Sequence, residues 1–132
     1  MRLYLDAVVI IYAVERIEPW AELVAARMTG EQITSLTSEL SCLECKVRPL
    51  RLNQEDVIVG FEAFFAEGVS ELLPVSREVL ERAAALRAQH HFLKTPDAIH
   101  LAAAIEGKCD VFLTNDHRLD RFTEITVEVL SA

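Results

Sequence analysis

The chain has 132 residues, of which 52% are hydrophobic and 26% are charged, and its formal net charge is -8. This length is typical of one domain, so we expect residues 1–132 to form a single domain. No apolar run reaches the roughly 20 residues that cross a bilayer, and we expect a cytoplasmic protein without a membrane segment. The acidic balance argues against a module that grips nucleic acid by phosphate contacts alone. It does not exclude a protein whose acidic groups bind a divalent cation, because the metal then supplies the positive charge that a phosphate needs.

Strand-like runs rich in β-branched and large apolar residues recur along the chain. They lie at residues 2–5, 32–36, 70–75, 110–114 and 125–130. Helical patterns separate nearly all of them, which predicts an α/β fold with a parallel sheet covered on both faces. Only the last two runs are close together, so we expect a short helix or loop between them.

Several helix boundaries are marked by capping residues and prolines. Pro49 is expected to kink or end the helix that precedes it, because proline lacks the backbone N–H of a helix interior. The other expected boundaries are N-caps at Asn53 and Ser76 and a helix that begins at Thr95-Pro96 and ends at Gly107.

Asp6 is the one charged residue in the run LYLDAVVIIYAV, residues 3–14. An unpaired carboxylate in apolar surroundings is costly, so either Asp6 reaches solvent or a cation compensates its charge. Asp116 follows the fourth strand-like run as Asp6 follows the first. The carboxyl ends of parallel strands meet at one edge of a sheet, where neighbouring strands are about 4.8 Å apart. We therefore expect Asp6 and Asp116 to lie close together.

Two further acids are candidates for the same edge: Glu44, on the helix after the second strand, and Asp97, in the first turn of the helix TPDAIHLAAAI. Each acid alone has an ordinary explanation. Asp6 suits a helix cap, Asp97 suits the helix dipole, Glu44 suits a solvated helix face and Asp116 suits a turn. The hypothesis of a shared site rests on their convergence.

Converging carboxylates repel one another unless a cation neutralises them. Ligands that are all oxygen atoms favour Mg²⁺ or Mn²⁺ over zinc. The sequence CLEC, with Cys42 and Cys45, lies inside a helical pattern and lacks a second ligand pair, so we interpret it as buried thiols rather than a zinc or redox site.

The four acidic segments together resemble a known family. YLDAVVIIYAVE, SELSCLECKVRPLR, TPDAIHLAAA and VFLTNDHRL are similar, in order and spacing, to the four acidic blocks of PIN-domain ribonucleases, and most closely to VapC-type toxins of toxin–antitoxin pairs. The resemblance implies a three-layer α/β/α fold with a five-stranded parallel sheet and an Mg²⁺- or Mn²⁺-dependent endoribonuclease. It also implies a homodimer and inhibition by a VapB-type antitoxin. The metal-site and catalytic residues that it implies are Asp6, Glu44, Asp97 and Asp116, with Thr114 and Asn115 as supporting residues.

His100 lies one helical turn after Asp97 and shares its face, and we interpret it as a hydrogen-bonding support. Asp6, Asp97 and Asp116 are the better candidates for direct ligands. Glu44 is expected to act through water, as a ligand or as the base that orients it. The metal would polarise the scissile phosphate and activate water, so no nucleophilic side chain is needed.

The sequence departs from the family pattern directly after the first aspartate. The family commonly has Ser or Thr and then Asn there, whereas this chain has Ala7 and Val8. Groups that orient a metal ligand can change metal affinity or activity 10–100-fold. The alternative function is therefore a catalytically weak or inactive PIN-fold module that binds RNA or protein.

Two groups of residues each have two possible roles. The basic side chains that follow the second and fourth acids suit either a phosphate-facing rim or a solvated surface: Lys46, Arg48 and Arg51, and Arg118 and Arg121. Phe61, Phe64 and Phe65 exceed what one buried helix stripe needs, so they suit either the core or a contact with a partner protein.

Overall fold

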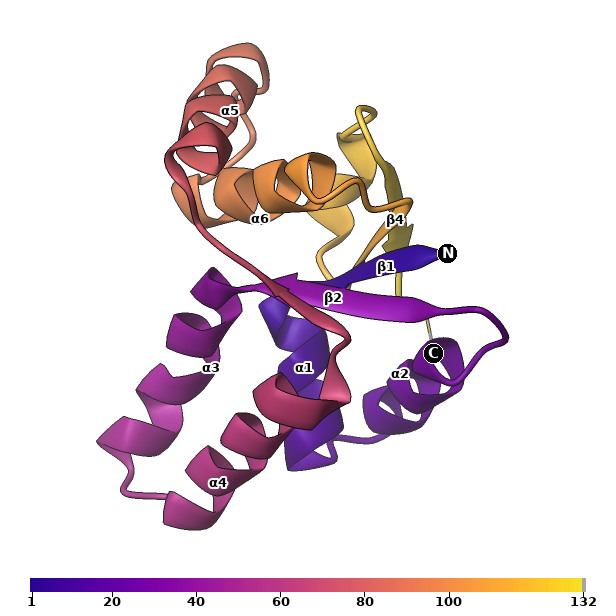
Figure 1. Cartoon of the computed structure of the whole chain (residues 1–132), viewed down its shortest axis with the longest axis vertical. Helices are drawn as coiled ribbons and strands as arrows, with labels where there is room; N and C mark the ends of the chain where they lie inside the picture. The colour runs from indigo at the N-terminus through magenta and orange to yellow at the C-terminus, as the bar shows by residue number, and fades with distance from the viewer. Residues whose placement is uncertain (132) are drawn as a thin grey trace.

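The computed structural model describes residues 1–131, and these contain one five-stranded sheet between two layers of helices (Figure 1). All neighbouring strands are parallel, in the order β3-β2-β1-β4-β5. The expected α/β fold class with a five-stranded parallel sheet is confirmed. The strands are β1 (Arg2–Leu5), β2 (Thr34–Ser38), β3 (Glu71–Leu73), β4 (Val111–Thr114) and β5 (Thr126–Val129).

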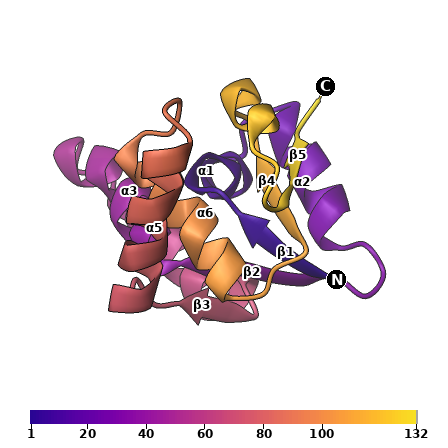
Figure 2. The same ribbon diagram turned by 90° about the horizontal axis from the view of Figure 1, so that it is seen from above.

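The helices divide between the two faces of the sheet. Figure 1 shows α5 and α6 on one side and α1 to α4 on the other, and Figure 2 shows α5 and α6 packed side by side. None of the helices within residues 1–131 has the length and apolar character needed to cross a membrane. The helices are α1 (Ala7–Glu15), α2 (Trp20–Met28), α3 (Glu39–Arg51), α4 (Glu55–Ala63), the π-helical turn η1 (Phe64–Gly68), α5 (Arg77–Gln89), α6 (Thr95–Glu106) and the 3₁₀ helix η2 (His117–Arg121).

The central strand β1 is buried on both faces of the sheet. Leu3 and Leu5 point into the core beneath α1, while Tyr4 points into the core beneath α5 and α6, and all three are fully buried. Because a strand buried on both faces needs apolar residues at every position, β1 has no alternation of polar and apolar residues. Each large apolar side chain buried in this way contributes about 1.5–3 kcal/mol.

Some boundaries differ from those expected. β2 begins at Thr34 rather than at residue 32, because Gln32 has a left-handed backbone (φ 60°) that turns the chain before the strand. The N-cap expected at Asn53 is wrong: Asn53 has φ 52°, which asparagine tolerates, and Gln54 occupies the N-cap position of α4 without a side-chain capping hydrogen bond. Helix α3 continues through Pro49 and ends two residues later.

Other boundaries are confirmed. Ser76 caps α5 by accepting a hydrogen bond from the backbone N–H of Val79 at 3.2 Å. Helix α6 covers Thr95–Glu106 with Gly107 as its C-cap, and the short helix expected between the last two strands is η2.

The strand order sets the place of the functional site. From β1, the chain proceeds to β2 and β3 on one side, and β4 and β5 complete the sheet on the other. The order thus reverses between β1 and β4. In open α/β sheets, ligands bind outside the carboxyl ends of the strands at such a reversal. Asp6 directly follows β1, and Asp116 lies two residues after β4.

Candidate active site

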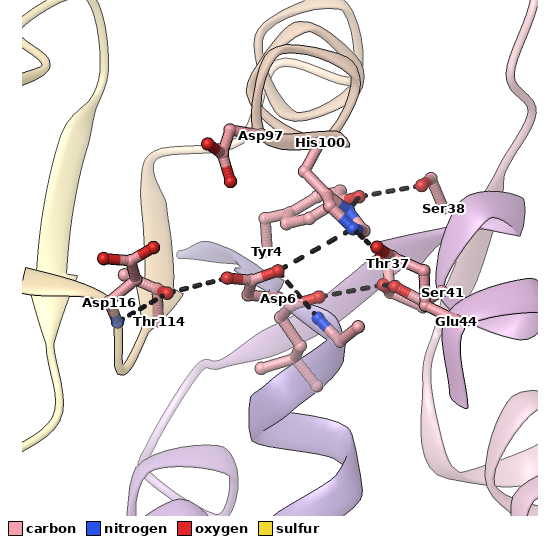
Figure 3. Close-up of polar contacts among 12 residues, drawn as sticks. Tyr4, Asp6, Thr37, Ser38, Ser41, Glu44, Asp97, His100, Thr114 and Asp116 are labelled. Atoms are coloured by element: carbon pink, nitrogen blue, oxygen red, sulfur yellow. Dashed lines mark hydrogen bonds and ion pairs between the residues drawn. The ribbon is translucent and has the colours of Figure 1, made fainter. Parts of the chain in front are cut away.

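Asp6 lies at the carboxyl end of β1, where two groups orient its carboxylate (Figure 3). Oδ1 accepts a hydrogen bond from the backbone N–H of Ala7 at 2.9 Å, so Asp6 also caps α1. Oδ2 accepts a hydrogen bond from the Thr114 hydroxyl at 2.7 Å. Burial raises the pKa of Asp6, and His100 and Thr114 only partly offset this effect. A nearby cation would therefore favour the ionised form of Asp6.

Thr114 connects Asp6 to Asp116. Its side chain is fully buried at the end of β4, next to β1 in the sheet. The Oγ1 atom donates to Asp6 and accepts a hydrogen bond from the backbone N–H of Asp116 at 3.1 Å. One hydroxyl thus fixes the carboxylate of Asp6 and the backbone of Asp116, which brings the two acids to the same edge of the sheet.

Asp97 approaches this edge from the first turn of α6. Its Oδ2 accepts a hydrogen bond from the backbone N–H of Lys94 at 2.9 Å, which stabilises the helix start. Figure 3 shows the carboxylate pointing toward the side of the site where Asp6 and Asp116 lie. The same Oδ2 is 3.3 Å from Nη2 of Arg118, which is also 2.6 Å from Oδ2 of Asp116. Burial acts to raise the pKa of Asp116, but the hydrogen bonds from Arg118 outweigh it and lower that pKa.

Glu44 joins the site through His100. The imidazole of His100, on α6, is 3% exposed. Its Nε2 hydrogen-bonds Oε1 of Glu44, on α3, and lies 3.7 Å from Oδ1 of Asp6. Its Nδ1 is 2.8 Å from the hydroxyl of Tyr4, on β1. His100 therefore connects two of the acids with the buried core.

Sequence reasoning missed the hydroxyl groups beneath the acids. The Tyr4 hydroxyl donates to Oγ of Ser38 at 2.8 Å, and burial strongly raises the pKa of Tyr4, so the phenol stays protonated. The Thr37 hydroxyl donates to the carbonyl of Leu5 at 2.8 Å and bonds Ser41 at 2.7 Å. The signal in the sequence is the density of Ser and Thr in TSLTSELS, residues 34–41, at the end of β2 and the start of α3.

Asn115 makes its side-chain hydrogen bond to α1 rather than to one of the four acids. Its side-chain amide donates a hydrogen bond to the hydroxyl of Tyr12 at 2.7 Å, and the Tyr12 ring stacks on Trp20 at 5.5 Å. Asn115 therefore anchors α1 beside the site. An open hollow of about 520 Å³ lies there, lined by Asp6, Val8, Asn115, Asp116 and His117.

The four acids form two pairs, and each pair shares a basic side chain. Arg118 contacts Asp97 and Asp116, whereas His100 contacts Asp6 and Glu44. Within residues 1–131, no three His, Cys, Asp or Glu side chains are already grouped as metal ligands. The donor set nevertheless fits a hard divalent cation, because two carboxylates already converge on one cationic nitrogen. Mg²⁺ needs only one or two carboxylates and retains several waters, so Asp97 and Asp116 could hold it with water completing its shell.

The family model of the PIN domain matches residues 3–125. This chain belongs to the PIN domain family. No curated protein matches its sequence. The PIN domain is similar over nearly all of its length to chains of several solved structures.

Three of these structures illustrate the likeness. A chain of VapBC2 from Rickettsia felis, bound to a DNA fragment from their promoter, has a TM-score of 0.80 at 14% identity, covering 99% of this chain and 100% of that chain. A chain of VapBC-1 from nontypeable Haemophilus influenzae has a TM-score of 0.75 at 19% identity, with 98% of both chains covered. VapC20 of Mycobacterium tuberculosis, a sarcin-ricin loop cleaving toxin, has a TM-score of 0.72 at 13% identity, with 94% of this chain and 98% of that chain covered. At these identities the likeness establishes the fold.

Ala7 and Val8 are where this PIN domain departs from the expected pattern, and the structure shows what orients Asp6 there. Ala7 contributes its backbone N–H, and Thr114 contributes its hydroxyl from β4. Val8 places an apolar side chain on the wall of the hollow. The Asp6 carboxylate is therefore oriented without a hydroxyl at position 7, although the hollow lacks the amide that an asparagine at position 8 would provide.

The remaining basic, aromatic and cysteine residues singled out in the sequence lie outside the group of four acids. Lys46 forms an ion pair with Glu62 of α4, while Arg48 and Arg51 are exposed. Phe61 and Phe65 are buried in the core beneath α1, and Phe64 packs against that core. Among residues 1–131 the three cysteines are free thiols, and burial raises the pKa of Cys45 to about 12.

Proposed function

We propose that this PIN domain is an Mg²⁺- or Mn²⁺-dependent endoribonuclease and the toxin of a type II toxin–antitoxin pair. The observation that carries the proposal is the placement of three aspartates at one edge of the sheet, outside β1 and β4. Asp6 and Asp116 are joined through Thr114, and Asp97 and Asp116 share one cationic nitrogen. Support comes from the similarity to VapC20 of Mycobacterium tuberculosis, a sarcin-ricin loop cleaving toxin.

In the proposed reaction, Asp6, Asp97 and Asp116 hold the cation. A divalent ion bound there supplies the Lewis acidity that polarises a phosphate and makes water a better nucleophile. Thr114 keeps the Asp6 carboxylate turned toward the hollow, and Glu44, held by His100, orients the attacking water and accepts its proton. The buried Tyr4 and Ser38 fix the ring of His100 from below.

The proposed partners are RNA, a second copy of the chain and a VapB-type antitoxin. A protein partner is supported by large apolar side chains that stay exposed on α3, on α4 and between them. Leu43 is 63% exposed, Leu50 58%, Leu52 53% and Val59 66%. Similar solved structures include a toxin–antitoxin complex from Klebsiella pneumoniae. Light scattering of the chain alone, and with an antitoxin expressed from the same operon, tests both partners.

A second candidate function is a PIN fold that binds RNA or protein without turnover. Val8 favours it, because this side chain lines the hollow where a polar group would orient water. The two candidates share the fold and differ in whether RNA is cut.

Nuclease assays with Mn²⁺ on the wild type and on Asp97→Asn separate the candidates. An asparagine at position 97 can still accept the hydrogen bond from the Lys94 N–H, so the helix start survives while the charge is lost. The control is Asp120→Asn, on the exposed surface of η2. We expect the wild type and the control to cleave RNA and Asp97→Asn to be inactive. If none of the three proteins cleaved RNA, the nuclease function would be rejected in favour of a PIN fold that binds without turnover.

A further inference from the structure

Arg118 occupies the place between two proposed metal ligands. Its Nη2 lies 2.6 Å from Oδ2 of Asp116 and 3.3 Å from Oδ2 of Asp97, and its Nε lies 3.2 Å from Oδ1 of Asp116. The guanidinium thus forms a two-pronged contact with one carboxylate and reaches the other. These oxygens come from α6 and from the segment after β4, which are far apart in the sequence.

A guanidinium and a divalent cation cannot both occupy the place between the carboxylates of Asp97 and Asp116. We propose that Arg118 is an internal counter-ion that holds Asp97 and Asp116 together in the metal-free protein and is displaced when Mg²⁺ or Mn²⁺ binds. This inference rests on the proposed metal site and deepens it. Arg118 competes with the metal ion for the carboxylates of Asp97 and Asp116. The competition sets the metal affinity of the site.

The position of Arg118 allows this displacement. Its side chain is 42% exposed, and it extends from the short helix η2 at the surface. Ion pairs of this exposure contribute little net stability, so a divalent cation, with twice the charge, can replace the guanidinium, which then turns into solvent. Its other contact is a long hydrogen bond, 3.4 Å, to the carbonyl of Phe92.

His100, the basic side chain of the other acid pair, has no such freedom. It is 3% exposed and its two ring nitrogens face Glu44 and Tyr4. Displacement of His100 would leave the buried hydroxyl of Tyr4 without this partner. Metal binding is therefore expected to move Arg118 and to leave His100 in place.

Arg121 provides a matched control on the same helix. Its guanidinium lies over the ring of Phe92, 4.5 Å from the ring centre, and not between the acids. Replacing Arg121 changes the net charge of the protein as replacing Arg118 does. A difference between the two variants therefore reports position and not overall charge.

Titration calorimetry with Mn²⁺ at pH 7.5 tests the proposal on the wild type, Arg118→Met and Arg121→Met. Arg118→Met is expected to bind Mn²⁺ about two- to five-fold more tightly than the wild type, and Arg121→Met is expected to match the wild type. Arg118→Lys restores the charge and is expected to return the Kd toward that of the wild type. Thermal unfolding checks that each variant folds.

Nuclear magnetic resonance supplies the structural readout. Saturating Mg²⁺ is expected to shift the Arg118 Nε–H signal of the wild type, because its hydrogen bond to Asp116 is lost. An unchanged or weaker Kd for Arg118→Met, or an unmoved Arg118 signal at saturation, would overturn the proposal. If no protein in the series bound Mn²⁺, the competitor role would also be excluded, while cleavage of RNA in the separate assay would still decide the nuclease function.

Discussion

The hydroxyl of Thr114 donates to Oδ2 of Asp6 at 2.7 Å across the neighbouring strands β4 and β1. Thr114→Val keeps the shape of the side chain but leaves a carboxylate oxygen of Asp6 without this partner. We expect a loss of about 1–3 kcal/mol in the free energy of unfolding and a 10–100-fold loss of metal affinity or cleavage rate. Urea unfolding and cleavage assays measure the two effects. Thr114→Ser should recover both, and equal behaviour of the Val and Ser variants would exclude an orienting role for the hydroxyl.

The raised pKa of Asp6 gives a pH dependence with a defined sign. Burial raises this pKa above its ordinary value of 3.8, so the folded protein binds the proton more tightly than the unfolded chain. The tighter binding of this proton stabilises the folded protein. The stabilisation is complete below the pKa of Asp6 in the unfolded chain and is lost as pH rises through its pKa in the folded protein. Asp6→Asn should therefore stabilise the metal-free protein more at pH 8 than at pH 4. Urea unfolding at both values tests this, and a gain of equal size at both would contradict the assignment.

The contact between His100 and Tyr4 predicts coupled effects on stability. His100→Phe removes both ring nitrogens and leaves the buried Tyr4 hydroxyl with Ser38 alone of its two partners, which should cost about 1–3 kcal/mol. Tyr4→Phe keeps the stacking on Phe112, 5.2 Å between ring centres. In a double-mutant cycle the combined loss should be smaller than the sum of the single losses by 0.5 kcal/mol or more. Additive losses would show that the two side chains do not act together.

The cysteines should be slow to react in the folded protein. Burial raises the pKa of Cys45 to about 12 and of Cys109 to about 11, and it also raises the pKa of Cys42. Since the thiolate is the reactive form, a thiol reagent at pH 7.5 should modify the folded chain much more slowly than the chain in urea. The interpretation of CLEC as buried thiols holds for Cys45, whereas Cys42 is only partly buried. Rapid modification of Cys45 in the folded protein, or tight binding of zinc, would contradict it.

The placement of Asp6 and Asp116 at one edge of the sheet could be predicted from the sequence, because each acid follows a strand of a parallel sheet. An acid that follows a strand emerges at the carboxyl edge whatever surrounds it, and the order of the strands then decides which acids are neighbours. The position of Asp97 could be predicted for a similar reason, since Thr95-Pro96 and Gly107 mark the helix that carries it.

The bridges between the acids could not be predicted in this way. Arg118 was as ambiguous as Arg121, although one lies between two carboxylates and the other lies on Phe92. The two residues lie three positions apart in a short 3₁₀ helix. The segments packed around this helix, and not the local sequence, decide what each guanidinium contacts. The same holds for Tyr4, whose role depends on Ser38 and His100, and for β2, whose start depends on the left-handed backbone of Gln32.

The proposed metal site requires a divalent ion to bind Asp6, Asp97 and Asp116 together. Anomalous diffraction from a crystal soaked in MnCl₂ tests it most directly, because the manganese signal locates the ion independently of any activity. We expect one strong anomalous peak, or two adjacent peaks, within bonding distance of oxygens from these aspartates. A crystal without such a peak, or with manganese bound elsewhere while these carboxylates keep their places beside Arg118 and His100, would contradict it.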